Sequence, residues 1–195
     1  MSPRRPERRS EEAAKAVIQA ARELCQEVGY AKLSIEGIAA RAGVGKNTIY
    51  RWWPSKGAVL LDGLLELWGE AAPFPDTGDA VADFKTQMKA AVGAFSSELG
   101  QHYRALLGEV QHDGVLAEAL QERLLRPMMA RATDRIELAK RQGQIRGDLD
   151  AELAIELLYG PIYHRWLLSQ RAPEPARIEA MVDSVFTGMT PRPDL

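Results

Sequence analysis

Apolar residues recur every three or four positions along almost the whole chain, which is the period of an α-helix. The first such stretch follows Ser10, a residue type that favours helix N-termini, and stops before Gly29, a residue type that favours helix ends. Its apolar face consists of Ala14, Val17, Ile18, Ala21, Leu24, Cys25 and Val28. Because no segment alternates in the way that strands do, the pattern predicts an all-α protein.

Three further helices are expected in quick succession. Ser34 can cap a short helix over residues 35–42, and another short helix is expected over about 46–52. Ser55 can cap a fourth helix that extends to about residue 71. Its buried stripe would be Val59, Leu60, Leu64, Leu65 and Trp68.

Residues 73–78 read as a linker that separates this part from the rest of the chain. Beyond it we expect helices over about 79–99, 101–111, 115–142, 150–169 and 174–189. Pro127 and Pro161 lie inside the third and fourth of these helices, so each is expected to be kinked or divided there. The tail over residues 191–194 is expected to fray.

The composition is that of a globular protein, with 46% hydrophobic residues in a chain of 195. No uninterrupted apolar stretch approaches the roughly 20 residues of a membrane-spanning helix, and no apolar segment follows the basic N-terminus as in a signal peptide. The one cysteine, Cys25, cannot form an internal disulfide and sits where a buried small residue is expected. We therefore expect a cytoplasmic protein with no membrane partner.

Charge is distributed unevenly along the chain. Residues 1–60 carry a net charge of +5 and residues 61–195 a net charge of −7. A basic N-terminal part fits contact with phosphates, although segregation of this kind also arises by chance.

Two short helices joined by the small residues of 42–45 form a helix-turn-helix pattern. The second helix would pack on the first through Ile35, Ile38 and Ala39, while Val44 and Ile49 would turn inward and anchor the third. The remaining faces of the third helix would then present donor-rich side chains: Lys46, Asn47, Thr48, Tyr50 and Arg51, with Trp52 at the end. A short helix of this kind fits the major groove of DNA, which is about 12 Å wide.

Over residues 10 to about 65, the sequence resembles the tetracycline-repressor (TetR) family. The residues that carry the resemblance are Ser34, Ile38-Ala39, Ala42-Gly43-Val44, Thr48-Ile49-Tyr50, Trp52-Trp53 and Ser55-Lys56. Three positions depart from the family pattern: Gly37 where an acidic residue is frequent, Gly45 where Ser is common, and Trp52 where His or Tyr is common. These departures leave the operator sequence open.

The resemblance implies a DNA-binding domain over residues 1–54, with a flexible basic arm at 1–9, joined through the fourth helix to a ligand-binding and dimerisation domain over 55–195. It implies DNA contacts to phosphates by Thr48, Tyr50 and Lys56, to bases by Lys46 and Asn47, and further contacts by Ser34, Arg51 and Trp52. Arg51 could equally read a base, hold a phosphate or be solvated, and Trp52 could contact a phosphate or pack. Trp53 is expected to pack between helices. The arginine pairs of the arm could reach the minor groove or form a solvated tail.

The resemblance thins after residue 70. It implies that the last two helices pair with those of a second copy, for which the apolar candidates are Tyr163, Trp166, Val182, Val185 and Phe186. It also implies a cavity for a small apolar effector, whose candidate lining is Trp68, Phe84, Met88, Phe95, Tyr103, Met128 and Tyr159. Taken singly, each of these residues is also what plain core packing requires.

The sequence gives less support to other classes of function. No nucleophile elbow, phosphate-binding glycine loop or metalloprotease motif is present, and the three histidines show no metal-ligand spacing. The expected function is a repressor that binds a palindromic DNA operator as a homodimer, needs no cofactor or metal and is released by a small molecule. The alternatives are an activator, a nucleoid-type DNA binder without an inducer, or a helical enzyme.

Overall fold

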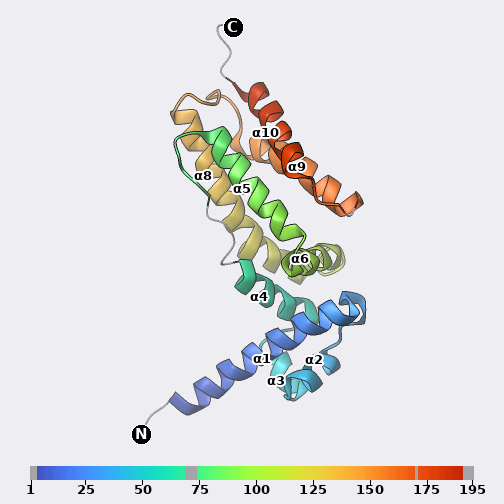
Figure 1. Ribbon diagram of the computed structural model, residues 1–195. Helices are drawn as coiled ribbons and strands as arrows, with labels where there is room; N and C mark the ends of the chain where they lie inside the picture. The colour runs from blue at the N-terminus through green and yellow to red at the C-terminus, as the bar shows by residue number, and fades with distance from the viewer. Residues whose placement is uncertain (1–3, 69–73, 170, 191–195) are drawn as a thin grey trace. The chain divides into compact units, whose positions relative to one another are not determined.

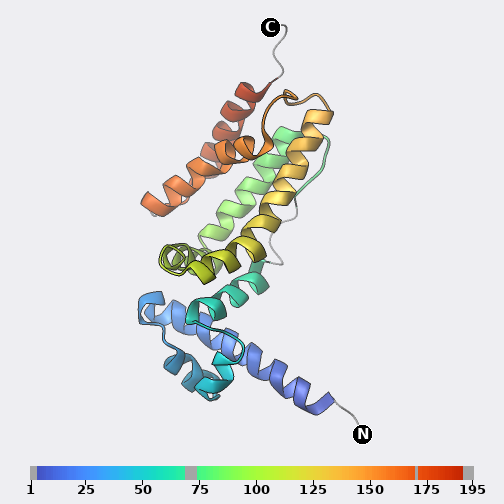
Figure 2. The same cartoon turned by 180° about the vertical axis from the view of Figure 1, so that it is seen from behind.

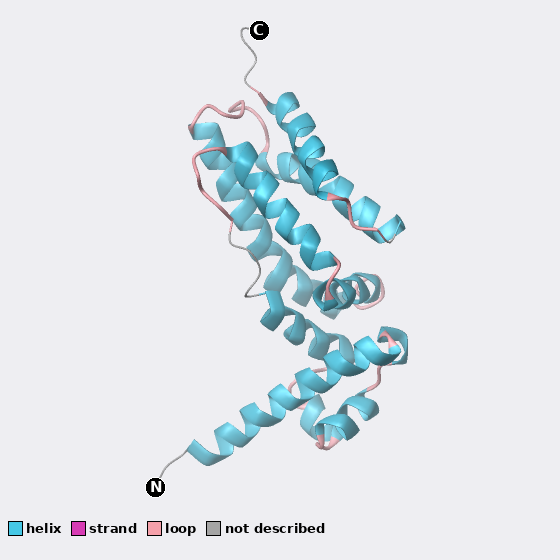
Figure 3. Ribbon diagram, viewed as in Figure 1, coloured by secondary structure: helices cyan, strands magenta, loops and turns pink. Residues whose placement is uncertain are grey.

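The computed structural model describes residues 4–68, 74–169 and 171–190, and every regular element in these ranges is helical (Figure 1, Figure 3). The predicted all-α class is confirmed. The elements are α1 (Arg4–Val28), η1 (Tyr30–Lys32), α2 (Ile35–Ala42), α3 (Lys46–Tyr50), α4 (Lys56–Trp68), α5 (Ala80–Phe95), α6 (Glu98–Glu109), α7 (Gly114–Leu120), η2 (Gln121–Leu125), α8 (Arg126–Arg141), α9 (Ala151–Ser169) and α10 (Pro175–Met189). The expected extension of the fourth helix to residue 71 and the tail over 191–194 lie outside the described residues.

One compact unit, here called unit 1, combines residues Met1–Glu70 with Glu98–Leu120. Within it, α1 packs against α2 and α4, and α6 packs against α4 and α1 (Figure 1). Its core consists of buried aliphatic side chains: Val17, Ala21, Ile38, Ile49, Leu60, Leu61, Leu64 and Leu106. The regulatory part expected to begin at residue 55 includes α4, α6 and α7; of these, α4 and α6 pack against α1, and α7 packs against α4.

The contact between α7 and α4 depends on a missing side chain. A Cβ atom at Gly57 would lie 2.6 Å from Cδ2 of Leu116 and 3.0 Å from the hydroxyl oxygen of Tyr30. Leu116 is only 3% exposed. The bare backbone of Gly57 therefore lets a leucine of α7 seat against the first turn of α4.

The first helix begins earlier than its sequence pattern predicted. α1 starts at Arg4 rather than after Ser10, so residues 4–9 of the expected flexible arm are helical, while residues 1–3 lie outside the described part. Pro6 does not prevent this, because the first turn of a helix uses no backbone N–H groups as donors.

The two helices that contain prolines behave differently. The helix over 115–142, which we expected to be kinked or divided at Pro127, is interrupted: α7 passes through the π-helical turn η2 into α8, where Pro127 is the second residue. In contrast, α9 continues through Pro161 without a division. Leu157, one turn earlier, is exposed, so water can reach the carbonyl group that Pro161 leaves without a donor.

The second compact unit, unit 2, comprises residues Ala71–Ser97 and Gln121–Leu195. Here α5 packs against α10 and α8, and α8 packs against α9; the rear view shows α5 and α8 side by side (Figure 2). Aromatic rings fill this core: the ring centroids of Phe84 and Phe186 lie 5.6 Å apart, and Phe95 stacks on Trp166 at 4.3 Å. Such pairs contribute beyond the apolar area that they bury.

A buried ion pair joins α5 to α8 in unit 2. Nη2 and Nε of Arg135 lie 2.7 and 2.8 Å from Oδ2 of Asp83, and the two side chains are 4% and 0% exposed. Thr77 adds hydrogen bonds from its backbone N–H and its hydroxyl, the latter at 2.7 Å, to the same carboxylate. Burial alone would raise the pKa of Asp83, but the hydrogen bonds from Thr77 and Arg135 outweigh burial and lower it.

We expect Asp83→Asn to lower the free energy of unfolding by about 3–5 kcal/mol, because Arg135 would keep a buried charge without a counter-ion. The double variant Asp83→Leu with Arg135→Met removes both charges and should lose much less. Urea unfolding followed by circular dichroism at neutral pH measures both, and equal losses in the two variants would contradict this account.

The same pair predicts a pH dependence. Because the pKa of Asp83 is lowered on folding, its stabilisation is complete above the ordinary value of 3.8 and is lost as the pH falls through the lowered pKa. Asp83→Asn should lack this part of the acid transition.

Candidate nucleic-acid interface

The helix-turn-helix has the caps and turns that its sequence predicts. Ser34 has an extended backbone conformation and caps α2: its Oγ accepts a hydrogen bond from the Gly37 N–H at 3.1 Å. Gly43 adopts a left-handed conformation, with φ of 68°, and donates its N–H to the Ala39 carbonyl. A residue with a Cβ is strained at that φ, so the glycine allows α2 to end sharply before α3.

The recognition helix α3 is anchored by one side chain. Ile49 is fully buried, as predicted, and Val44 before it is half-buried. Lys46, Asn47, Tyr50, Arg51 and Trp52 are exposed, and Thr48 is half-buried. Five of the six candidate contacts in this segment are therefore accessible; their contacts with DNA stay a prediction.

Two neighbouring tryptophans have opposite surroundings. Trp52 is 53% exposed, and the guanidinium carbon of Arg51 lies 5.7 Å from its ring centroid. Trp53 is buried, and its Nε1–H donates to Oδ2 of Asp62 on α4 at 2.7 Å. The expectation that Trp53 packs between helices is confirmed, and Trp52 is free to present its indole N–H outward.

Lys56, expected to contact phosphate, has partners within unit 1. Its Nζ donates to the backbone carbonyl groups of Tyr30 and Leu33, each at 2.9 Å, and lies 4.4 Å from the Tyr30 ring centroid. Lys56 thus ties the start of α4 to the turn between α1 and α2. A phosphate contact by its remaining N–H stays a prediction.

Two charged residues of the helix-turn-helix were not singled out from the sequence. Nζ of Lys46 lies 3.0 Å from Oε1 of Glu36, and both side chains are exposed. Arg41 pairs with Glu27 at 2.8 Å and with Glu23 at 3.4 Å, both on α1. For Glu36, the sequence did hold a signal, because it is the one carboxylate from Ser34 to Lys56.

The residues expected to line a ligand cavity fall into both units. In unit 1, the ring centroids of Trp68 and Tyr103 lie 5.5 Å apart. In unit 2, Phe84, Met88 and Phe95 are buried, whereas Met128 and Tyr159 are half-buried, and the Tyr159 hydroxyl donates to Gln87. The structure thus groups these residues as core neighbours within each unit, and their contact with a ligand stays a prediction.

The residues expected at a dimer interface differ in how far the structure exposes them. Trp166, Val182 and Phe186 are buried in the core of unit 2, and Tyr163 and Val185 are half-buried. α9 is apolar on more than one side, and the sequence pattern did not indicate which side faces inward, whereas the apolar side of α10 faces the core of unit 2. The apolar residues that α9 leaves exposed are instead Leu153, Leu157, Leu167 and Leu168.

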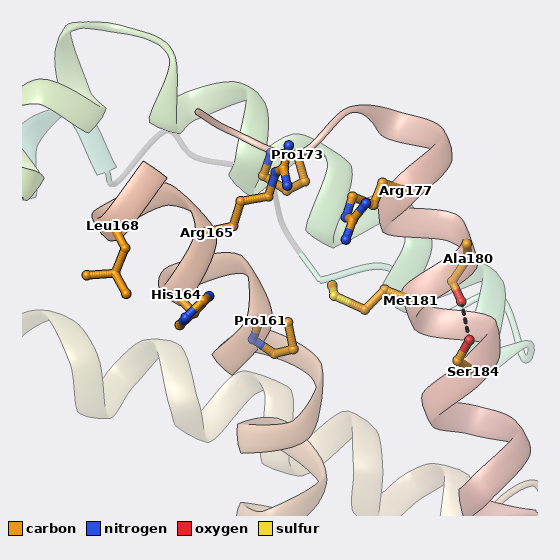
Figure 4. Close-up of a pocket in the computed structure, with 9 residues that line it drawn as sticks. All are labelled: Pro161, His164, Arg165, Leu168, Pro173, Arg177, Ala180, Met181 and Ser184. Atoms are coloured by element: carbon orange, nitrogen blue, oxygen red, sulfur yellow. Dashed lines mark hydrogen bonds between the residues drawn. The ribbon is translucent and has the colours of Figure 1, made fainter. Parts of the chain in front are cut away.

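A cleft of about 560 Å³ lies between α9 and α10. In Figure 4, Pro161, His164 and Leu168 come from one helix and Met181 from the other, while Arg165, Pro173 and Arg177 lie at one end. Ala180 and Ser184 complete the lining. None of the expected cavity or interface residues belongs to it.

Within the described part of the chain, nothing indicates a metal site or a membrane-spanning helix. No group of three His, Cys, Asp or Glu residues there could hold a metal ion. No helix in the same ranges is long and apolar enough to cross a membrane.

Two family models match the chain. "Bacterial regulatory proteins, tetR family" matches residues 17–62, which contain the helix-turn-helix. "Tetracyclin repressor-like, C-terminal domain" matches residues 74–185. Together they cover both the DNA-binding segment and most of unit 2.

Similar proteins are transcriptional regulators. The uncharacterised HTH-type transcriptional regulator YdeS of Bacillus subtilis is 34% identical over 97% of this chain and 96% of its own. The DNA-binding transcriptional repressor TetR of Mycobacteroides abscessus is 26% identical over 91% of this chain and 94% of its own. A crystal structure of a TetR-family transcription regulator is 35% identical, with a TM-score of 0.74, over 92% of this chain and 100% of that chain. The chain therefore belongs to the TetR family of helix-turn-helix transcriptional regulators.

Proposed function

We propose that this protein represses transcription by binding a palindromic operator as a homodimer, and that a small, largely apolar effector releases it. The observation that carries the proposal is the exposed, donor-rich surface of α3 in a helix-turn-helix that its own framework holds in place. Repression is the typical role in this family. Since a regulator must reach chromosomal DNA, we place it in the cytoplasm.

The side chains of α3 divide by chemistry. Asn47 can bind an adenine edge through two hydrogen bonds, and Lys46 can donate to guanine acceptors, so these two would read bases. Tyr50 and Thr48 carry hydroxyl donors suited to phosphate, and the exposed indole N–H of Trp52 adds another. Phosphate contacts set the position of the protein on DNA, whereas base contacts set its sequence preference.

Homodimerisation is needed to place two copies of α3 one helical turn of DNA apart. The exposed side of α9 suits this role. It carries Leu153 and Leu157 beside acidic Glu156 in its first half, and Leu168 beside His164 and Arg165 in its second half. An antiparallel pairing with a second α9 would place the acidic half opposite the basic half. Gly160, between the halves, has open space at its Cβ position and would allow close approach.

The effector part of the proposal rests on the aromatic core of unit 2 and on the small ligands that regulators of this family typically bind. A ligand can release DNA only if it binds the non-DNA-binding state more tightly. Phe84, Met88, Phe95, Met128 and Tyr159 are the residues that we expect to sense it.

The function is tested by selecting bound fragments from random DNA. We expect one palindromic sequence to be enriched, and Asn47→Ala to weaken binding to it by about 1–3 kcal/mol while relaxing the preference at one position in each half-site. Gln26→Ala, an exposed change on α1, is the control. Salt-dependent binding with no enriched sequence would favour the nucleoid-type alternative.

The dimer surface is tested by Leu157→Glu, which places a charge on the exposed side of α9. We expect a folded monomer with weakened operator binding, because an unpaired charge would be buried in the interface. Val115→Glu, at an exposed apolar position on α7 that is 71% accessible, should leave the dimer intact. Analytical ultracentrifugation gives the mass, and a monomeric wild-type protein at micromolar concentration would refute the model.

The effector is tested by screening apolar compounds for a rise in thermal stability and then measuring operator affinity. Compounds that bind unit 2 should weaken operator binding about 5–150-fold, the range of ordinary allosteric coupling. Strong stabilisation with unchanged operator affinity would contradict the coupling.

A further inference from the structure

We propose that Glu36 sets the DNA specificity of this protein by holding the ammonium group of Lys46 away from phosphates and in position to read a base. The proposal rests on the DNA-binding function proposed above and adds a positioning residue to it. Its basis is the ion pair between the first turn of α2 and the first residue of α3.

The geometry of this pair is direct. Nζ of Lys46 lies 3.0 Å from Oε1 of Glu36, and the two side chains are 53% and 64% exposed. The hydrogen bond from Lys46 lowers the pKa of Glu36, and the same bond raises the pKa of Lys46. Both groups are therefore charged at neutral pH, at the surface that we expect to meet DNA.

Glu36 has a special place among the charges of this segment. Between Ser34 and Lys56 the sequence has four basic residues and one acidic residue, Glu36. Arg41 is paired with carboxylates of α1, and Lys56 donates to two carbonyl groups. Lys46 is thus the basic side chain that is paired with a carboxylate of the helix-turn-helix itself, whereas Arg51 lies over the ring of Trp52.

Random DNA and a cognate site make different demands on this pair. On random DNA the main attraction is phosphate, so Lys46 would have to leave Glu36 and bring the bare carboxylate near a polyanion. An ammonium group has three donors, so at a cognate site Lys46 can keep one on Glu36 and offer the other two to the N7 and O6 acceptors of a guanine. Glu36 therefore weakens binding to random DNA more than binding to the operator.

The test compares affinities for random DNA and for the selected operator at several salt concentrations by fluorescence anisotropy. The proteins are wild type, Glu36→Gln, Lys46→Gln and the double variant. We expect Glu36→Gln to tighten binding to random DNA about two- to fivefold, the range that an exposed ion pair allows. Operator affinity should change less, and the salt slope on random DNA should steepen by about one unit.

Controls separate this role from a general effect of charge. Glu118→Gln removes one exposed carboxylate from α7 of the same unit and should not reproduce the gain. If Glu36 acts through Lys46, its replacement should have little effect in the Lys46→Gln background. Thermal melting shows that each variant is folded.

Two results would overturn the proposal: an equal gain on operator and random DNA, or the same gain with and without Lys46. A wild-type protein that selects no operator would instead refute the proposed function. The coupling between Glu36 and Lys46 on random DNA can still be measured in that case, so the two failures are distinguishable.

Discussion

A helix of five residues gains almost nothing from its own hydrogen bonds, so the position of α3 depends on what surrounds it. Ile49, fully buried, is the side chain that fixes it to the core. The rest of unit 1 supports that single anchor: Trp53 bonds to Asp62 after α3, and Lys56 ties the following turn back to residues 30–33. A rigid framework of this kind allows the exposed face of α3 to be polar throughout without loss of its position.

The local parts of this framework could be predicted from the sequence because their causes are local. Ser34, Gly43 and Ser55 cap or end helices through contacts with residues three or four positions away. The start of α1 was missed because a helix that can begin at either of two places leaves no sharp signal in composition. The division near Pro127 was predicted, because a proline inside a helix disfavours continuity, whereas α9 continues through Pro161.

The features that could not be predicted depend on contacts between segments that lie far apart in the sequence. The carbonyl partners of Lys56 lie more than twenty positions away, and nothing in periodicity indicates them. The same holds for α9, which has apolar residues on more than one side, and for α10: the pattern does not say whether an apolar side faces the core of its own chain or a second copy. Trp166 and Phe186 were therefore assigned to an interface, although they fill the core of unit 2.

Leu116 seated over Gly57 has a consequence for how such regulators can be recombined. The sequence motif ends near the loop before α4, so this loop is the obvious point at which to exchange DNA-binding segments between relatives. In this protein a graft at that point would cut through a core, because α6 packs with α1 and α4, and α7 packs with α4. A functional chimaera has to carry residues 98–120 along with the N-terminal segment, or match the glycine and the leucine as a pair. The unit that must be transferred therefore consists of two segments that are separate in the sequence. An insertion or deletion in the second segment alters the framework that supports the first.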